Sequence, residues 1–159
     1  MKFKLKHQIR ISDIGCGYGS FLVFLKEKKI KIYYSGYDIN KNFINYCVKN
    51  YPKNLFKVSY YPTELTDITV ASGTYNYTAT DNVKIWEEYI IFNLKKCMAQ
   101  SKFGLIFNLQ FTKKDSFIKN NIYYTNIDYM HDKLKNVFLK VNKFYSTKSL
   151  NDIYFIILK

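Results

Sequence analysis

The sequence predicts an α/β protein built on a doubly wound, mostly parallel sheet of seven strands, of which the last runs antiparallel. Three observations lead to this prediction. Short β-rich runs alternate with longer amphipathic segments, a glycine-rich turn follows the first β-rich run directly, and the chain closes with a pair of β-rich runs. Because no repeat, linker or low-complexity block divides the sequence, we expect a single domain covering residues 1–159.

Strands are predicted where apolar, β-branched and aromatic residues form short runs, and helices where apolar residues recur at helical spacing. In chain order the predicted elements are a strand at 9–14, a helix from about 19 to 27, a strand at 30–37, a helix at 40–51, strands at 55–60 and 68–71, a helix at 82–100, a strand at 103–109, a helix around 127–138, and strands at 141–145 and 153–158. Asn40 is placed to cap the second helix. Trp86 and Ile90 lie on the apolar stripe of the longest helix, where Glu87 and Glu88 are expected to be solvated.

Composition narrows the function classes. The net charge of +13 invites a nucleic-acid partner, but only Arg10 among the 25 basic residues is an arginine, and the lysines are spread along the chain. A dedicated nucleic-acid surface more often clusters its charge and uses arginine, so nucleic acid stays open as a partner without being favoured. No apolar run reaches the roughly 18–20 residues that span a bilayer, and no signal-type apolar segment follows the basic residues 1–6. We therefore expect a cytoplasmic protein without a membrane partner.

The three cysteines, Cys16, Cys47 and Cys97, are far apart and form no cluster with zinc-ligand spacing. We expect buried or half-buried, reduced thiols and no metal site. His131, at the edge of an apolar helix face, is expected to be a packed or surface histidine rather than a catalytic base.

A glycine-rich turn with the sequence DIGCGYG, residues 13–19, follows the first strand and opens the first helix. Glycine permits positive φ angles, and its missing side chain lets a ligand approach the backbone closely. The dinucleotide pattern Gly-x-Gly-x-x-Gly would place its third glycine at position 20, where this chain has Ser20, and the phosphate-binding loop ending in Gly-Lys-Ser/Thr is absent. Asp13, two residues before the first glycine, suits a ligand with an ammonium group better than one with a pyrophosphate.

The end of the second strand is the next candidate element, because Asp38 stands there and Ile39 follows it. In a doubly wound sheet this strand end lies beside the first turn, where a carboxylate can accept hydrogen bonds from both hydroxyls of a ribose. Asp38 comes 19 residues after Gly19, a workable distance for a helix and a strand. Ile39 is placed to lie against an adenine face.

The pattern Asp-x-Gly-x-Gly-x-Gly at 13–19 and the acid at Asp38 resemble the two cofactor motifs of class I S-adenosylmethionine (SAM)-dependent methyltransferases. The resemblance covers nearly the whole chain and implies a Rossmann-like methyltransferase fold with SAM as the cofactor. It implies that Gly15 and Gly17 run beneath the methionine part of SAM, that Asp13 helps to hold its amino group, and that Asp38 binds the ribose. The cofactor-binding residues that it implies are Asp13, Gly15, Cys16, Gly17, Gly19, Asp38, Ile39 and Ser72.

The segment Ala-Ser-Gly-Thr-Tyr-Asn at 71–76 resembles a stretch in a subgroup of bacterial methyltransferases, at the strand end that adjoins the transferred methyl group. Tyr75 and Asn76 are therefore candidate substrate-binding residues, with a plain turn as the competing interpretation. Tyr123, in the expected loop after the fifth strand, is a candidate substrate lid or an ordinary hydrophobic anchor. Methyltransferases that act on exocyclic base amines usually carry an Asp/Asn-Pro-Pro-aromatic motif at this place. This chain has no proline near 71–76, so the resemblance implies that base amines are a disfavoured acceptor.

Two features depart from the family pattern. The first strand begins within about eight residues of Met1, without an N-terminal helical segment over the cofactor, and the third strand ends in Ser59-Tyr60-Tyr61 instead of an acid that contacts the adenine amine. The leading hypothesis is a methyltransferase with a small-molecule methyl acceptor, such as a sugar or metabolite hydroxyl, and with no catalytic residue identified. The alternatives are an RNA or protein methyltransferase, or an inactive SAM-fold binding module. A homo- or hetero-oligomer in which a partner supplies the cover is left open.

Overall fold

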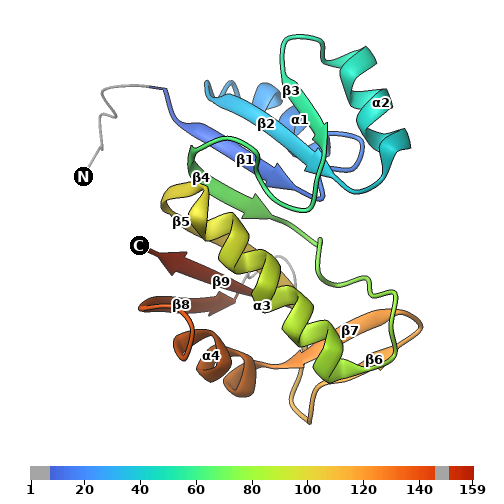
Figure 1. Ribbon diagram of the computed structural model, residues 1–159, viewed down its shortest axis with the longest axis vertical. Coiled ribbons are helices and arrows are strands. Elements are labelled where there is room, and N and C mark those ends of the chain that lie inside the picture. Colours follow the sequence, from blue (N-terminus) through green and yellow to red (C-terminus); the bar gives the residue numbers. More distant parts are fainter. Residues whose placement is uncertain (1–7, 146–150) are drawn as a thin grey trace.

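The computed structural model describes residues 8–145 and 151–159, so the basic start of the chain lies outside the described part. Within these described residues, an open sheet of nine strands has helices against both of its faces (Figure 1). The strands are β1 (Arg10–Ile14), β2 (Tyr33–Asp38), β3 (Leu55–Val58), β4 (Thr66–Ala71), β5 (Ser101–Thr112), β6 (Phe117–Lys119), β7 (Ile122–Asn126), β8 (Lys140–Tyr145) and β9 (Asp152–Leu158). The helices are α1 (Ser20–Glu27), α2 (Lys41–Asn50), α3 (Val83–Ala99) and α4 (Ile127–Lys135).

Five parallel strands run in the order β3-β2-β1-β4-β5. The chain moves outward from β1 to β3 and then crosses back to β4 on the other side of β1. In open α/β sheets, ligands bind beyond the carboxyl ends of the strands at such a switch point. The carboxyl ends of β1, β2 and β4 are therefore where the sequence motifs should meet.

The long strand β5 has different partners along its length. Residues 104–110 pair antiparallel with β9, which pairs antiparallel with β8, while residues 110–112 pair parallel with β7. The predicted fold class, a mostly parallel doubly wound sheet with an antiparallel last strand, is confirmed.

The predicted number of seven strands is wrong, because a β-hairpin occupies part of the segment expected to be a loop after β5. Strands β6 and β7 pair antiparallel around Asn120 and Asn121, whose φ angles are 52° and 61°. Two successive left-handed residues form the hairpin turn whose twist matches that of the strands, and asparagine tolerates this conformation better than most residues. Tyr123 and Thr125 of β7 point inward and are buried.

The apolar core is divided between the two faces of the sheet. On β2, Tyr34 belongs to a cluster under α1 and α2, and Tyr37 belongs to a larger cluster under α3 and α4. In the larger cluster the buried rings of Phe107 and Phe155 stack with their centroids 5.2 Å apart. Truncating such a ring to alanine costs about 3–5 kcal/mol. Helix α3 packs on this cluster through Ile90 and Leu94, which are both fully buried.

Glu87 of α3 is buried, with 2% of its surface exposed, so the expectation of a solvated residue is wrong. The Tyr123 hydroxyl donates to its Oε1 at 2.7 Å, and the Lys133 ammonium donates to its Oε2 at 2.7 Å. A buried carboxylate is tolerated only with such partners. Glu87 thereby links α3 to β7 and α4, whereas Glu88 is exposed as expected.

The described residues bring together no group of three His, Cys, Asp or Glu side chains that could hold a metal ion. No helix among them is long and apolar enough to cross a bilayer. The three cysteines are unpaired and buried, as expected. His131 is packed, as expected, with its Nε2 atom 3.2 Å from the carbonyl oxygen of Val141.

Candidate functional site

Three glycines shape the turn after β1, with φ angles of 70° at Gly15, 52° at Gly17 and 80° at Gly19. An added Cβ at Gly15 would lie 2.6 Å from Oγ1 of Thr74, and one at Gly19 would lie 2.9 Å from the Tyr51 ring, so both positions allow close packing. Gly17 differs, because a Cβ there would meet nothing within 4 Å. The turn therefore presents bare backbone at Gly17 to open space, where a ligand can approach.

Asp38, at the end of β2, connects the two sequence motifs. Its Oδ2 accepts a hydrogen bond from the backbone N–H of Gly17 at 3.0 Å, and its Oδ1 accepts one from the N–H of Asn40 at 2.8 Å. Each oxygen of a carboxylate can accept more than one hydrogen bond, so the group can also bind a ligand. Asp38 is 8% exposed and lines a pocket, as does Ile39, which is 59% exposed.

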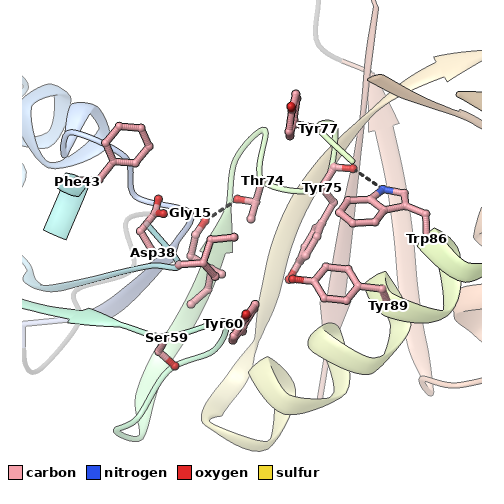
Figure 2. Close-up of a pocket in the computed structure, with 12 residues that line it drawn as sticks. Gly15, Asp38, Phe43, Ser59, Tyr60, Thr74, Tyr75, Tyr77, Trp86 and Tyr89 are labelled. Carbon is pink, nitrogen blue, oxygen red and sulfur yellow. Dashed lines mark hydrogen bonds between the residues drawn. The ribbon is translucent and has the colours of Figure 1, made fainter. Parts of the chain in front are cut away.

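This pocket has a volume of about 280 Å³ and lies between the glycine turn, the ends of β2 and β3, and the start of α3. In Figure 2, Asp38 and Phe43 lie on one side, and Tyr75, Trp86 and Tyr89 lie on the other. Among the described lining residues Asp38 alone carries a charged side chain. We call the tyrosine and tryptophan residues that line this pocket the aromatic wall, which consists of Tyr60, Tyr75, Tyr77, Trp86 and Tyr89.

Asp13 lies beneath the turn and is 3% exposed, and it is not among the described lining residues of the pocket. The Tyr34 hydroxyl donates a hydrogen bond to its Oδ2. Burial raises the pKa of Asp13 to about 7, the hydrogen bond from Tyr34 opposes this rise, and the nearby charge of Asp38 adds to it. Asp13 therefore titrates near neutral pH in the cofactor-free protein.

The other residues implied for the cofactor have different surroundings. Cys16 is buried under the turn, and its thiol pKa is raised by burial and by the charge of Asp13, so it is an unreactive packing residue. The thiol of Cys47 on α2 donates to the carbonyl oxygen of Gly17 at 3.3 Å, which connects α2 to the turn. Ser72 is exposed beyond β4 and is not among the described lining residues.

Of the three candidate substrate residues, the structure brings only Tyr75 into the pocket. Asn76 fixes the loop, since its Oδ1 accepts from the N–H of Gln110 at 3.0 Å and its carbonyl oxygen accepts from the N–H of Tyr123 at 2.8 Å. The expectation that Tyr123 lies in a loop is wrong, because it is fully buried in β7 and donates to Glu87. Its position is that of the ordinary anchor, away from the described lining of the pocket.

Most of the aromatic wall could not be recognised from the sequence. The sequence places Trp86 on the apolar stripe of a helix but does not indicate a pocket there. Tyr89 follows it by about one helical turn, which is the usual pattern of a core-facing helix surface. The structure shows their rings stacked with centroids 4.9 Å apart, half-buried at the pocket. Tyr60, expected at the end of the third strand, lies just after β3 in the segment that stands in place of the family's acid, and the neighbouring Ser59 donates its hydroxyl to the carbonyl oxygen of Tyr61 at 2.7 Å.

Comparison with known proteins gives one sequence relative and many similar structures, although no family model matches the chain. A Mycobacterium tuberculosis protein that is provisionally named a methyltransferase is 26% identical over 134 residues, which cover 82% of this chain and 81% of that protein. DesVI of Streptomyces venezuelae superposes with a TM-score of 0.70 at 12% identity, covering 95% of this chain and 84% of DesVI. Magnesium protoporphyrin IX methyltransferase of Synechocystis PCC 6803, with bound S-adenosylhomocysteine (SAH), gives 0.65 at 12% identity, covering 96% of this chain and 74% of that one. At such identities the structural likenesses show the fold.

Proposed function

We propose that the chain is a class I SAM-dependent methyltransferase that transfers the methyl group of SAM to a small molecule, at the hydroxyl of a sugar or another metabolite; a sequence relative named as a methyltransferase and the shared fold support this proposal. The observation that carries this proposal is the meeting of the bare backbone of Gly17 with the carboxylate of Asp38 at the switch point of the sheet. A cationic, ribose-bearing ligand matches both halves of this arrangement.

The residues present fit SAM. Asp38 would accept hydrogen bonds from the ribose hydroxyls, and Ile39, exposed beside it, would pack against the adenine. Gly15 and Gly17 would lie beneath the methionine part, where an added Cβ at Gly17 would occupy the open space. The charge of Asp13 beneath the turn would favour the ammonium group through the backbone rather than by lining the pocket.

When bound, SAM supplies an electrophilic methyl group on a sulfonium. The protein has to hold an acceptor oxygen in line with the carbon–sulfur bond and exclude water, and orientation of this kind is worth on the order of 7–11 kcal/mol in model reactions. We assign no residue as a general base.

Titration calorimetry with SAM and SAH tests the proposed cofactor. We expect both to bind and to raise the melting temperature, and we expect NAD to give neither heat nor a shift. Binding of NAD in preference to SAH would contradict the assignment of the site. Absence of heat and of a thermal shift at millimolar SAH would favour an inactive module of the same fold.

The pKa of Asp13 predicts a pH dependence of cofactor binding. Since the pKa is about 7 before binding, the carboxylate form rises from a small fraction at pH 6 to a majority at pH 7.5. The dissociation constant of SAH should therefore fall by about fivefold to tenfold between these pH values, if a cationic ammonium needs the ionised form. Calorimetry at both pH values checks this, and Asp13→Asn, which keeps an acceptor for Tyr34, should abolish the dependence.

The same raised pKa affects stability without cofactor. The folded pKa of about 7 exceeds the ordinary value of 3.8, so the folded state binds the proton more tightly than the unfolded chain does. The protonated carboxyl group of Asp13 therefore stabilises the folded state, in full below the ordinary pKa of 3.8. This stabilisation is lost as the pH rises through about 7. For the binding prediction of the preceding paragraph, an SAH dissociation constant that does not change with pH in the wild-type protein would show that the charge of Asp13 does not contribute to cofactor binding.

A further inference from the structure

Helices cover only part of the sheet on the face that carries α1 and α2. These two helices pack over β2 and β3, on the cluster that includes Tyr34 and Phe56. On the opposite face, α3 and α4 cover β5 and β9, where Leu105, Phe107 and Phe155 are at most 1% exposed. Figure 1 shows α3 in front of β5 and β9, whereas α1 lies behind β1 and β2. Within the described part of the chain, the α1 face of β4, β5 and β9 therefore has no helix packed on it.

Strand register places apolar side chains side by side on this uncovered part, because residues paired across neighbouring strands share a face. Asp13, which accepts the hydrogen bond from Tyr34 on the α1 face, pairs with Val70, Val70 pairs with Ile106, and Ile106 pairs with Ile156. The last three are half-buried and belong to neither apolar cluster. The rows on either side add further apolar residues, including the stacked rings of β8 and β9. We call this surface the open face, which consists of Ile68, Val70, Ile106, Phe144, Tyr154, Ile156 and Leu158.

The strands of the open face have the sequence of strands that are covered on both sides. A strand with one face in solvent alternates apolar and polar residues, whereas a strand buried on both faces is apolar throughout. Residues 153–158 of β9 read IYFIIL, without a polar position. Ile153, Phe155 and Ile157 are fully buried under the helices, so Tyr154, Ile156 and Leu158 are the half that lacks a cover. A contiguous apolar surface of this kind marks an interaction site.

The size of the open face fits one helix. β4, β5 and β9 together are about 14 Å wide, and five residues of a strand extend over about 17 Å. A helix with its side chains is about 10–12 Å wide, and 12 helical residues are about 18 Å long. Two copies of the chain that met only through this face would fall short of the about 800 Å² per partner that a stable interface buries.

Charge also favours a different partner over a second copy. Lys140 pairs with Leu158 at the border of the open face, Lys159 follows Leu158, and both lysines are exposed. The open face itself has no charged member, and the net charge of +13 opposes self-association. We propose that the open face binds an amphipathic α-helix of a partner protein, whose apolar side lies on the sheet and whose polar side carries acidic residues.

Three synthetic peptides test this inference on the full chain by fluorescence anisotropy. The first is a labelled 14-residue helix with leucine on one side and glutamate on the other. The second has lysine in place of each glutamate, and the third has the composition of the first in an order that gives no apolar side. We expect the first peptide to bind at least about tenfold more tightly than either of the others. Absence of binding, or equal affinity for the glutamate and lysine peptides, would overturn the inference.

Variants of the open face locate the binding site. Phe144→Ser at the edge strand and Ile156→Thr, which keeps the β-branched shape, should each weaken binding of the glutamate peptide by about fivefold or more. Phe92→Ser is the matched control, because Phe92 is 56% exposed on α3, against the other face of the sheet, and its replacement should leave the affinity unchanged. The urea midpoint of each protein verifies that it is folded. If both open-face variants bind the peptide as the wild type does, the helix does not lie on this face.

The oligomeric state decides between a partner helix and a second copy. In sedimentation equilibrium the wild-type chain should be a monomer, and a dimer that Phe144→Ser dissociates would overturn the partner helix. SAH should bind the wild type, Phe144→Ser and Ile156→Thr equally, because the open face lies outside the pocket beside Asp38. Loss of peptide binding therefore leaves the proposed cofactor intact, and loss of SAH binding leaves the docking surface intact.

Discussion

Replacing Asp38 with alanine should weaken SAH binding by about 1.5–3 kcal/mol, which is roughly 10- to 150-fold in the dissociation constant. The change removes the acceptor that we assign to the ribose. It also removes the hydrogen bonds from Gly17 and Asn40, so the turn loses the group that ties it to β2. Both losses act on the same binding step, which is why this is the largest binding effect that we expect.

Calorimetry with SAH on three proteins checks this prediction. Asp38→Asn keeps an acceptor oxygen but loses the charge, and its affinity should lie between those of the wild type and Asp38→Ala. Asp115→Ala removes an exposed acid away from the pocket and should bind SAH normally. An unchanged dissociation constant in a folded Asp38→Ala protein would contradict the ribose role.

Replacing Gly104 with alanine should destabilise the protein by about 3 kcal/mol or more, the range reached by changes that force the backbone to move. Gly104 lies in β5 opposite Leu158 of β9, with a φ of 155°. An added Cβ would stand 2.1 Å from the backbone carbonyl oxygen of Ile157, far inside contact distance. Because the obstructing atom belongs to the backbone, a side-chain rotation cannot relieve the clash, and β9 has to separate from β5.

Urea unfolding of Gly104→Ala and Gly73→Ala measures this effect against a matched control. Gly73 also has a left-handed φ, 72°, but an added Cβ there meets nothing within 4 Å. Its substitution should cost only the conformational strain of about 1–2 kcal/mol. If the two variants unfold at the same urea concentration, the close approach of β5 and β9 does not govern stability.

The cofactor motifs were readable from the sequence because each depends on a few neighbouring residues. The glycine turn and Asp38 each follow a predicted strand, and the usual strand order of a doubly wound sheet places the two strand ends side by side. The N–H of Gly17 donates a hydrogen bond to Asp38, as this arrangement predicts. The hairpin was not readable, because Asn120-Asn121 and the short β7 also fit a polar loop with tyrosines. Glu87 was misplaced because its partners, Tyr123 and Lys133, are more than 30 positions away along the chain.

The aromatic wall shows a second limit of sequence reasoning. Its members come from the end of β3, the loop after β4 and helix α3, and nothing in their spacing relates Tyr60 to Tyr77 or to Trp86. They meet only because β4 lies beside β1 and α3 covers the neighbouring face. Aromatic residues are also abundant throughout this chain, which has 16 tyrosines and 13 phenylalanines, so an individual ring carries little information.

Trp86 is the single tryptophan of the chain and lies in the wall of the pocket. The indole emission of the protein therefore arises from one place, a half-buried ring that any occupant would shield from water. Its intensity and wavelength would register the arrival of each ligand without a label. Stopped-flow mixing could thus establish whether cofactor or acceptor enters first, a kinetic order that the native sequence makes measurable.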